Sequence, residues 1–288
     1  ICFGQDIDMI RFLLRKFFYD LWDNLFKAVL INLVFLCILV LAVTVPPLLV
    51  FPLLGAAAFV VLVFFAFVYV CAAALVLKEV SGYRSFGAGD FFGAFKSAWR
   101  SGLVLSGLFL AGFFLIRFAI PFYLALGGLA GAAVAAICFW TAITLAGAFQ
   151  FFPAVFSRLE KRPLKAVKKC LIIFFDNIPF SFFSLFFTAV LSFPVIFFPA
   201  FPLLYLDEAL RLRLLKYDWL EARASAANAA SATSAASATN AAGEETAGGP
   251  LPGNGKRRGK IPWGEILAEE MEKTGKRTWK DFVFPWRS

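Results

Sequence analysis

Charged residues are missing from three long stretches of this chain, and this absence constrains the fold more than any other feature. No Asp, Glu, Lys or Arg occurs from Ala28 to Leu77 or from Asn177 to Leu206, and Arg117 is the only one from Ser101 to Ser157. A helix needs about 20 apolar residues to cross the hydrocarbon core of a bilayer. Fifty uncharged residues therefore accommodate two spans and a tight turn, which predicts an all-α, polytopic helical membrane protein.

The apolar stretches predict three helical hairpins within one transmembrane domain. The domain covers residues 28–206, and its hairpins cover 28–77, 103–149 and 179–206. We expect the first turn around Pro46, Pro47 and Pro52, and the second from Pro121 to Gly128. In the third region, proline predicts a break near Pro194. One span, Pro179–Phe193, is then followed by a short or re-entrant arm. The expected fold has five spans plus this sixth arm.

Lys and Arg flank the spans on one side only. The N-terminal segment carries four, residues 78–100 carry four and residues 158–169 carry six, whereas the turns carry none. The positive-inside rule places the N-terminus and both basic loops in the cytoplasm. Basic residues also follow the last apolar stretch closely, so we expect a cytoplasmic C-terminus. We expect no cleavable signal peptide, because Pro46 and Pro47 follow the first apolar run instead of a small-residue cleavage site.

Each hairpin follows a basic, aromatic stretch with helical periodicity. The stretches are residues 7–26, 90–102 and 155–175, and the first predicts an amphipathic interfacial helix within 1–27. In the third, Pro163 suits a first helical turn, and apolar residues such as Val167 oppose lysines such as Lys169. This pattern predicts helices that lie in the headgroup plane. The alternative is that these are ordinary juxtamembrane segments.

The C-terminal part divides by composition into three segments. Residues 207–223 predict a charged cytoplasmic helix, residues 224–260 a flexible linker that ends in the basic knot 256–260, and residues 261–288 an aromatic docking segment. The docking candidates are Trp279, Phe282, Phe284 and Trp286. The tail either folds back on the membrane or cytoplasmic face, with the knot touching anionic lipids, or docks in another protein's groove. A knot of five residues makes no nucleic-acid patch, so no nucleic acid is expected.

A few polar residues near the apolar stretches are candidate functional residues. Arg117 either snorkels to the outer headgroups or lines a pore or ligand site. Asn32 either bonds two helices or binds a substrate. Asp207, Glu208 and Arg211 belong either to a solvated interfacial helix with internal pairs or to a coupling helix that touches a partner.

Catalytic and metal-binding patterns are missing from the sequence. The chain has no histidine, and its five cysteines show no paired spacing. No phosphate-binding loop, nucleophile elbow or pair of carboxylates at catalytic spacing occurs. We therefore expect no enzymatic activity, no cofactor and no metal.

Three segments together resemble the YesL-like family of uncharacterised bacterial integral membrane proteins. They are the first span around Asn32 (LINLVFL), residues 91–102 (FFGAFKSAWRSG) and residues 151–179. The resemblance covers roughly residues 11–219. It implies a small helical protein of the bacterial cytoplasmic (inner) membrane that serves carbohydrate uptake beside ABC-type permeases. The chain departs from the family where Asp207 and Glu208 interrupt the third region early, and where the linker and tail extend beyond the usual end.

The expected function is therefore a non-enzymatic accessory or interaction subunit linked to carbohydrate (ABC-type) transport. Its expected partners are anionic membrane lipids at the basic loops and transporter permease subunits. One alternative is an autonomous channel or transporter that uses Arg117, Asn32 and the broken third hairpin. The other is a lipid-organising membrane scaffold.

Overall fold

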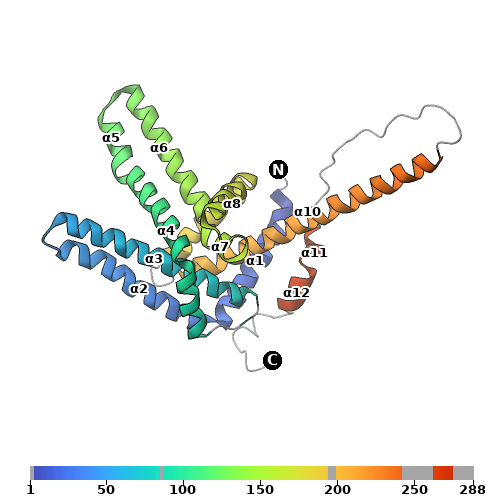
Figure 1. The fold of residues 1–288 in the computed structure, drawn as a ribbon, viewed down its shortest axis with the longest axis horizontal. Helices are drawn as coiled ribbons and strands as arrows, with labels where there is room; N and C mark the ends of the chain where they lie inside the picture. Colours follow the sequence, from blue (N-terminus) through green and yellow to red (C-terminus); the bar gives the residue numbers. More distant parts are fainter. Residues whose placement is uncertain (1–2, 83, 85–86, 194–198, 242–261, 275–288) are drawn as a thin grey trace. The chain divides into compact units, whose positions relative to one another are not determined.

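A computed structural model of the 288-residue chain describes all residues except 1–2, 83, 85–86, 194–198, 242–261 and 275–288. Within the described ranges the regular structure is entirely helical (Figure 1), which confirms the all-α prediction. The chain divides into two compact units, one of Ile1–Lys16 with Arg211–Ser288 and one of Phe17–Leu210. The apolar helices belong to the second unit.

Helices α1 and α2 follow each other almost without interruption. Helix α1 covers Phe3–Asp23, and α2 covers Leu25–Leu48. Helix α2 continues through Pro46 and Pro47, so the first turn is confined to residues 49–51, the last part of the predicted turn that ends at Pro52. Proline lacks the N–H that bonds to the carbonyl four residues earlier, and the helix ends within two residues of Pro47.

Helix α3, Pro52–Ser81, forms the centre of the Phe17–Leu210 unit. It packs against α2, α4 and α7, and its C-terminal half is buried on nearly all sides between Val68 and Leu77. The hydroxyl of Tyr69 donates a 2.8 Å hydrogen bond to the carbonyl of Ile31 on α2. Helix α4 also lies close to α3. A Cβ added at Gly102 of α4 would lie 2.6 Å from the Cα of Val68 on α3. The glycine therefore permits the close approach of α4 to α3.

The second hairpin is longer than predicted. Helix α4 (Ala88–Phe114), a π-helical turn η1 (Leu115–Ala119) and α5 (Ile120–Ala125) form one continuous arm, and α6 (Gly128–Phe149) returns. The turn lies at residues 126–127, not 121–128, and Gly127 adopts a φ of 71° there. Residues 90–102 are the first half of α4 and not a separate interfacial helix. A π-helical turn rearranges the hydrogen bonds around Pro121, so that proline does not end the arm.

The third region contains short helices and one long one. Helix α7 covers Phe152–Arg158, α8 covers Pro163–Asp176 and α9 covers Ile178–Ser192. Helix α8 begins at Pro163 and α9 ends one residue before Phe193, as the sequence predicts. The two helices meet at an angle of 108°.

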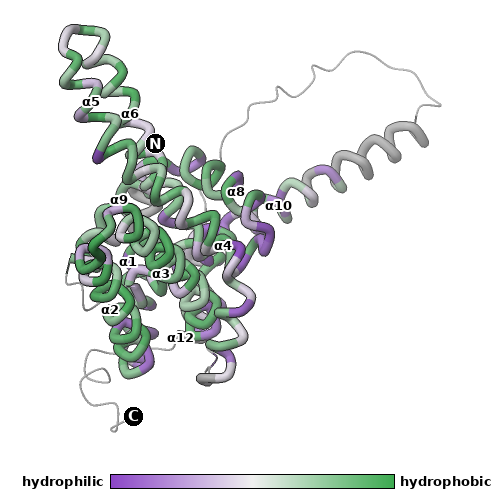
Figure 2. Tube along the Cα trace, turned by 60° about the vertical axis from the view of Figure 1, so that its left-hand side comes forward, coloured by the Kyte–Doolittle hydropathy of each residue, from purple (hydrophilic) through white to green (hydrophobic). Residues whose placement is uncertain are grey.

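Four segments of the described residues are long and apolar enough to cross a membrane. They are Leu25–Leu48, Pro52–Ser81, Gly89–Ala125 and Gly128–Arg158, and the bent pair α8–α9 is a fifth when counted as one span. Figure 2 shows hydrophobic residues along most of α2, α5 and α6. The chain is therefore an all-α, polytopic helical protein.

Helix α10 corrects three sequence-based boundaries. It runs from Ala200 to Ala241, so the predicted sixth arm, the charged helix 207–223 and the first half of the linker 224–260 are one helix. Alanine has the highest helix propensity, and the alanine-rich composition of residues 224–241 explains why the helix continues without apolar side chains to bury. The rest of that linker, residues 242–260, lies outside the described residues. Two short helices, α11 (Trp263–Ile266) and α12 (Ala268–Thr274), follow.

Candidate functional site: a buried ion pair where three helices meet

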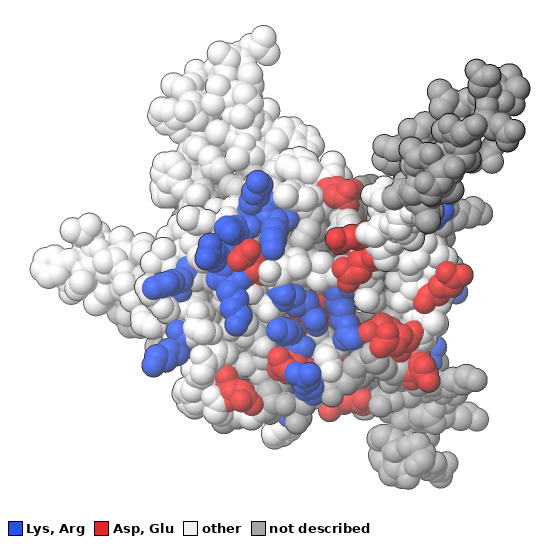
Figure 3. All heavy atoms as spheres, turned by 45° about the vertical axis from the view of Figure 1, so that its right-hand side comes forward, with Lys and Arg blue, Asp and Glu red and all other residues white. Residues whose placement is uncertain are grey.

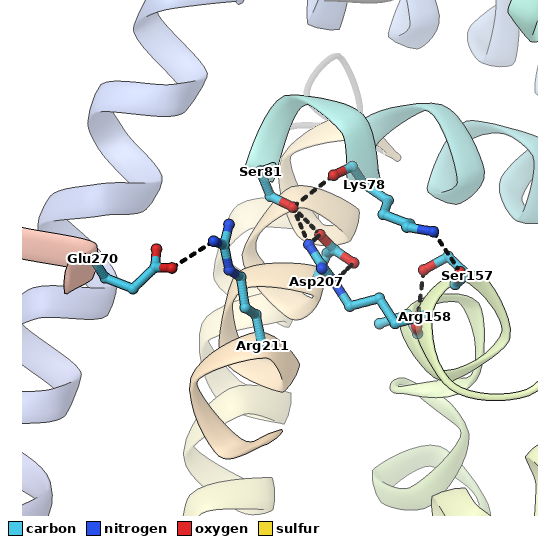
Figure 4. Close-up of polar contacts among 8 residues, drawn as sticks. Lys78, Ser81, Ser157, Arg158, Asp207, Arg211 and Glu270 are labelled. Carbon is cyan, nitrogen blue, oxygen red and sulfur yellow. Dashed lines mark hydrogen bonds and ion pairs between the residues drawn. The ribbon is translucent and has the colours of Figure 1, made fainter. Parts of the chain in front are cut away.

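A buried polar cluster joins the ends of three helices in the Phe17–Leu210 unit. Ser81 is the last residue of α3, Arg158 is the last residue of α7, and Asp207 lies two turns into α10. Figure 4 shows their side chains pointing toward one another. The three residues are far apart in the sequence, so the fold alone brings them together.

Arg158 and Asp207 form a bidentate ion pair. The Nε of Arg158 donates to Oδ1 of Asp207 at 2.7 Å, and Nη2 donates to Oδ2 at 2.6 Å. Asp207 is 1% exposed, and the Arg158 side chain is 15% exposed. Two parallel charge-assisted bonds fix both the distance and the relative orientation of the two groups. The pair therefore holds α10 in one position against α7.

Ser81 and Lys78 extend this cluster onto α3. The Ser81 hydroxyl accepts a hydrogen bond from Nη2 of Arg158 and lies within donor distance of Oδ2 of Asp207 and of the Lys78 carbonyl. The ammonium of Lys78 donates to the Ser157 carbonyl at 3.3 Å. All three helices are thus linked by side chains at one end of the helix bundle.

The chemistry of this cluster favours a structural function. Among the described residues, the hydroxyl of Ser81 and the guanidinium of Arg158 are the hydrogen-bond partners of Asp207. The Asp207 carboxylate that accepts from the Ser81 hydroxyl is itself held by the Arg158 guanidinium, which stays protonated. A buried pair of opposite charges is costly to break, because removal of one partner leaves the other uncompensated.

Burial contradicts the predicted solvated helix at Asp207 and Glu208. Glu208 is 0% exposed, and Arg213 one turn further is 2% exposed. The sequence-based interpretation lacked the counter-charge of Arg158, which lies 49 residues away and looked like one more cation of a basic loop. Arg158 and Ser81 were missed for this reason. The available signal was that Arg158 is the first charged residue after the long apolar stretch that ends at Ser157.

Arg211 belongs to the other unit and has its own partner there. Its Nη2 lies 2.5 Å from Oε1 of Glu270 on α12 (Figure 4), and Glu270 is 5% exposed. Trp263 and Leu267 of the same C-terminal segment are 5% and 1% exposed. This contact is the geometry expected of a tail that folds back on its own chain. The docking candidates Trp279, Phe282, Phe284 and Trp286 lie outside the described residues.

Asn32 bonds two helices, as one sequence-based interpretation predicts. Its Oδ1 accepts a 2.8 Å hydrogen bond from the N–H of Ala200, the first residue of α10. The first N–H groups of a helix have no partner within the helix, and Asn32 of α2 supplies one. Its Nδ2 is buried without a hydrogen-bond partner among the described contacts.

Arg117 lies within the π-helical turn η1, on an exposed face of the hairpin. Its guanidinium carbon is 5.9 Å from the centre of the Phe118 ring. It lies about 25 Å further along the arm than Arg100, which places it near the far side of a ~30 Å hydrocarbon core. Among the described residues, the interaction of Arg117 is with Phe118 and not with Asn32 or α10. The structure does not assemble the predicted pore-lining set.

No group of three or more His, Cys, Asp or Glu residues suited to a metal ion occurs in the described part of the chain. In comparisons with protein families, curated proteins and solved structures, no family, protein or structure matches this chain.

Proposed function

We propose that this chain is a non-enzymatic accessory or interaction subunit of the bacterial cytoplasmic (inner) membrane, linked to carbohydrate (ABC-type) transport. The resemblance to the YesL-like family supports the link to transport. The distribution of Lys and Arg supports an orientation with both termini in the cytoplasm. The ion-pair cluster then lies at the cytoplasmic ends of α3 and α7.

The exposure of the second hairpin is the observation that carries this proposal. We compare the most apolar 18 residues of each segment. In the two arms of this hairpin 11% and 17% of these residues are buried, against 56% in α3. Large apolar side chains such as Phe122, Ile137 and Trp140 are more than half exposed. Figures 1 and 2 show the tip of this hairpin projecting away from the tip of α2–α3. Such a surface suits contact with lipid and with the spans of another membrane protein.

Several polar groups of the described spans support the same proposal, because they bond within the protein. The hydroxyls of Thr44, Thr141 and Thr144 donate to carbonyls of their own helices, and Tyr69 bonds to a neighbouring helix. Gln150 donates to the Ser181 carbonyl. Groups that bond internally do not form a hydrophilic path for a solute.

Co-purification from native membranes tests the proposal. We expect carbohydrate-transporter permease subunits to purify in constant ratio with the full chain. The comparison variant ends after Ala241, where the described helix α10 ends, and it lacks the C-terminal segment. Loss of the subunits with this variant would place the contact on the tail. Retention would place it on the helices.

Two results would contradict the proposal. One is a full chain that purifies without transporter subunits after in-membrane crosslinking. The other is solute flux by the purified protein alone in liposomes.

A transporter is the second candidate, and one observation favours it. The unpaired Nδ2 of Asn32 lies beside the first residue of α10, close to the interruption between α9 and α10. Interrupted helices build substrate sites in several transporter folds. If this candidate is right, purified protein transports a solute and Asn32→Ala abolishes the flux while the protein still folds.

A further inference from the structure

Helix α8 presents three different faces. Ala166, Cys170 and Phe174 lie on one face and are 0–4% exposed. This face packs against α6 and α7. The contact with α6 is close, because a Cβ added at Gly147 would lie 2.5 Å from the Phe174 ring. The opposite side of α8 therefore has a fixed orientation.

The outward side of α8 carries an apolar strip and a neighbouring basic strip, and the exposed Ile172 lies within the basic one. Leu164 and Phe175 are 77% and 61% exposed, and with the half-buried Leu171 they lie on one edge. Lys165 and Lys168 are exposed on the other edge. At 100° per residue the two strips are adjacent and both lie away from the buried face. A helix at a bilayer surface needs this arrangement, with apolar side chains among the acyl chains and cations among the headgroups.

The angle between α8 and α9 agrees with this position. The two helices meet at 108° at Asn177. Helix α9 carries no charged residue, so a course of α9 into the bilayer directs α8 along its surface. The exposed apolar strip of α8 would then contact lipid and not water.

Charge accounting shows which cations of this segment remain available. Residues 158–169 contain six Lys and Arg residues and one acid, Glu160. Arg158 bonds to Asp207, and Lys169 lies 3.4 Å from Glu160. The other four form no ion pair among the described residues, and they are Lys161, Arg162, Lys165 and Lys168. Figure 3 shows basic side chains gathered in clusters away from the tips of the apolar hairpins.

We propose that α8 is an anionic-phospholipid binding helix, with Lys161, Arg162, Lys165 and Lys168 on the headgroup phosphates and the apolar strip among the acyl chains. Lipid is the occupant that the geometry favours, because an acidic protein partner would explain the cations but not the adjacent exposed Leu164 and Phe175. This inference needs only the polytopic fold and does not depend on a link to transport.

The test is a titration of the purified full chain in detergent with phosphatidylglycerol, and separately with phosphatidylcholine, read by native mass spectrometry. We expect a preference for phosphatidylglycerol that weakens as salt concentration rises. The variant Lys165→Gln/Lys168→Gln should bind phosphatidylglycerol about thirtyfold more weakly, at roughly fivefold for each cation near an anionic surface. Its affinity for phosphatidylcholine should not change.

Lys169→Gln is the matched control, because it removes the same charge from the same helix but from a lysine already paired with Glu160. It should bind phosphatidylglycerol nearly as the unmodified chain does. Wild-type affinity in the double variant, or an equal loss in the control, would overturn the proposal. Affinity that does not respond to salt would also overturn it, without any variant. An acidic peptide that binds α8 more tightly than phosphatidylglycerol would assign the helix to a protein partner instead.

Discussion

Removal of Arg158 should destabilise the protein strongly, because it leaves the carboxylate of Asp207 buried. Asp207 is 1% exposed and receives two bonds of 2.6 and 2.7 Å from Arg158. In Arg158→Met, the Ser81 hydroxyl is the partner of Asp207 that remains among the described residues. Loss of one partner of a buried ion pair costs about 3–5 kcal/mol, so this is the decrease that we expect in the free energy of unfolding.

The double variant Arg158→Met/Asp207→Leu separates an ion pair from a loss of packing. It removes both charges, and a buried pair replaced by apolar residues is often neutral in stability. The double variant should therefore be more stable than Arg158→Met alone, with a coupling free energy of at least about 2 kcal/mol in the double-mutant cycle.

Equilibrium unfolding in mixed micelles of a mild detergent and dodecyl sulphate, followed by far-UV circular dichroism, measures these differences. Lys169→Gln is the control, because it removes an ion pair that is partly exposed. The Lys169 side chain is 39% exposed and that of Glu160 is 21% exposed, and such pairs contribute about 0–1 kcal/mol to stability. The reasoning fails if Arg158→Met lies within about 1 kcal/mol of wild type, or if the double variant is less stable than both single ones.

Three further predictions concern packing, a hydrogen bond and pH. Gly102→Ala should cost roughly 1–3 kcal/mol through overpacking, because its Cβ would lie 2.5–2.7 Å from α3. Gly107→Ala, with no atom within 4 Å of the new Cβ, should be neutral or stabilising by up to about 1 kcal/mol; the same unfolding assay compares the two. Tyr69→Phe should cost about 1 kcal/mol through loss of its buried 2.8 Å bond, and an unchanged free energy of unfolding would contradict this. The Arg162 N–H, and then Lys169, hold the pKa of Glu160 below its usual value. The contribution of this carboxylate to stability is therefore complete above the usual glutamate pKa and is lost as pH falls through the lowered one. Carbon-13 NMR of the labelled carboxyl should show a pKa below that of a free glutamate, and a pKa at or above the free value would refute the assignment.

The sequence predicts the apolar, helical character of the spans well, because the cost of charge in a bilayer excludes charged residues from them over long stretches. Turn positions were less predictable. Pro46, Pro47 and Pro121 suggested turns, but helices continue through all three. Each proline lacks the N–H that would bond to the preceding turn of the helix. At Pro47 the helix ends one residue later, and before Pro121 a π-helical turn changes the hydrogen-bond pattern. Residue types alone do not show which of these a chain adopts.

The candidate site was less accessible to sequence analysis than the fold. Asn32 is identifiable because it is an amide within an apolar span, and its bond to Ala200 has the expected chemistry. The partner of Asp207 is not identifiable in the same way, because six cations of the segment 158–169 are equivalent in the sequence. The position of Arg158 at the end of α7, against α3 and α10, distinguishes it from the others.

Site-specific photocrosslinking in native membranes tests the proposed interaction surface most directly. A photoreactive residue replaces Ile137 on the second hairpin, which is 65% exposed, and in a control replaces Leu33 on α2, which is 56% exposed. If the second hairpin binds a partner, position 137 should give one discrete adduct that contains a transporter permease subunit. Position 33 should give lipid adducts. Lipid adducts alone from position 137, and from other exposed positions such as Phe122, would contradict the account of this chain as an interaction subunit.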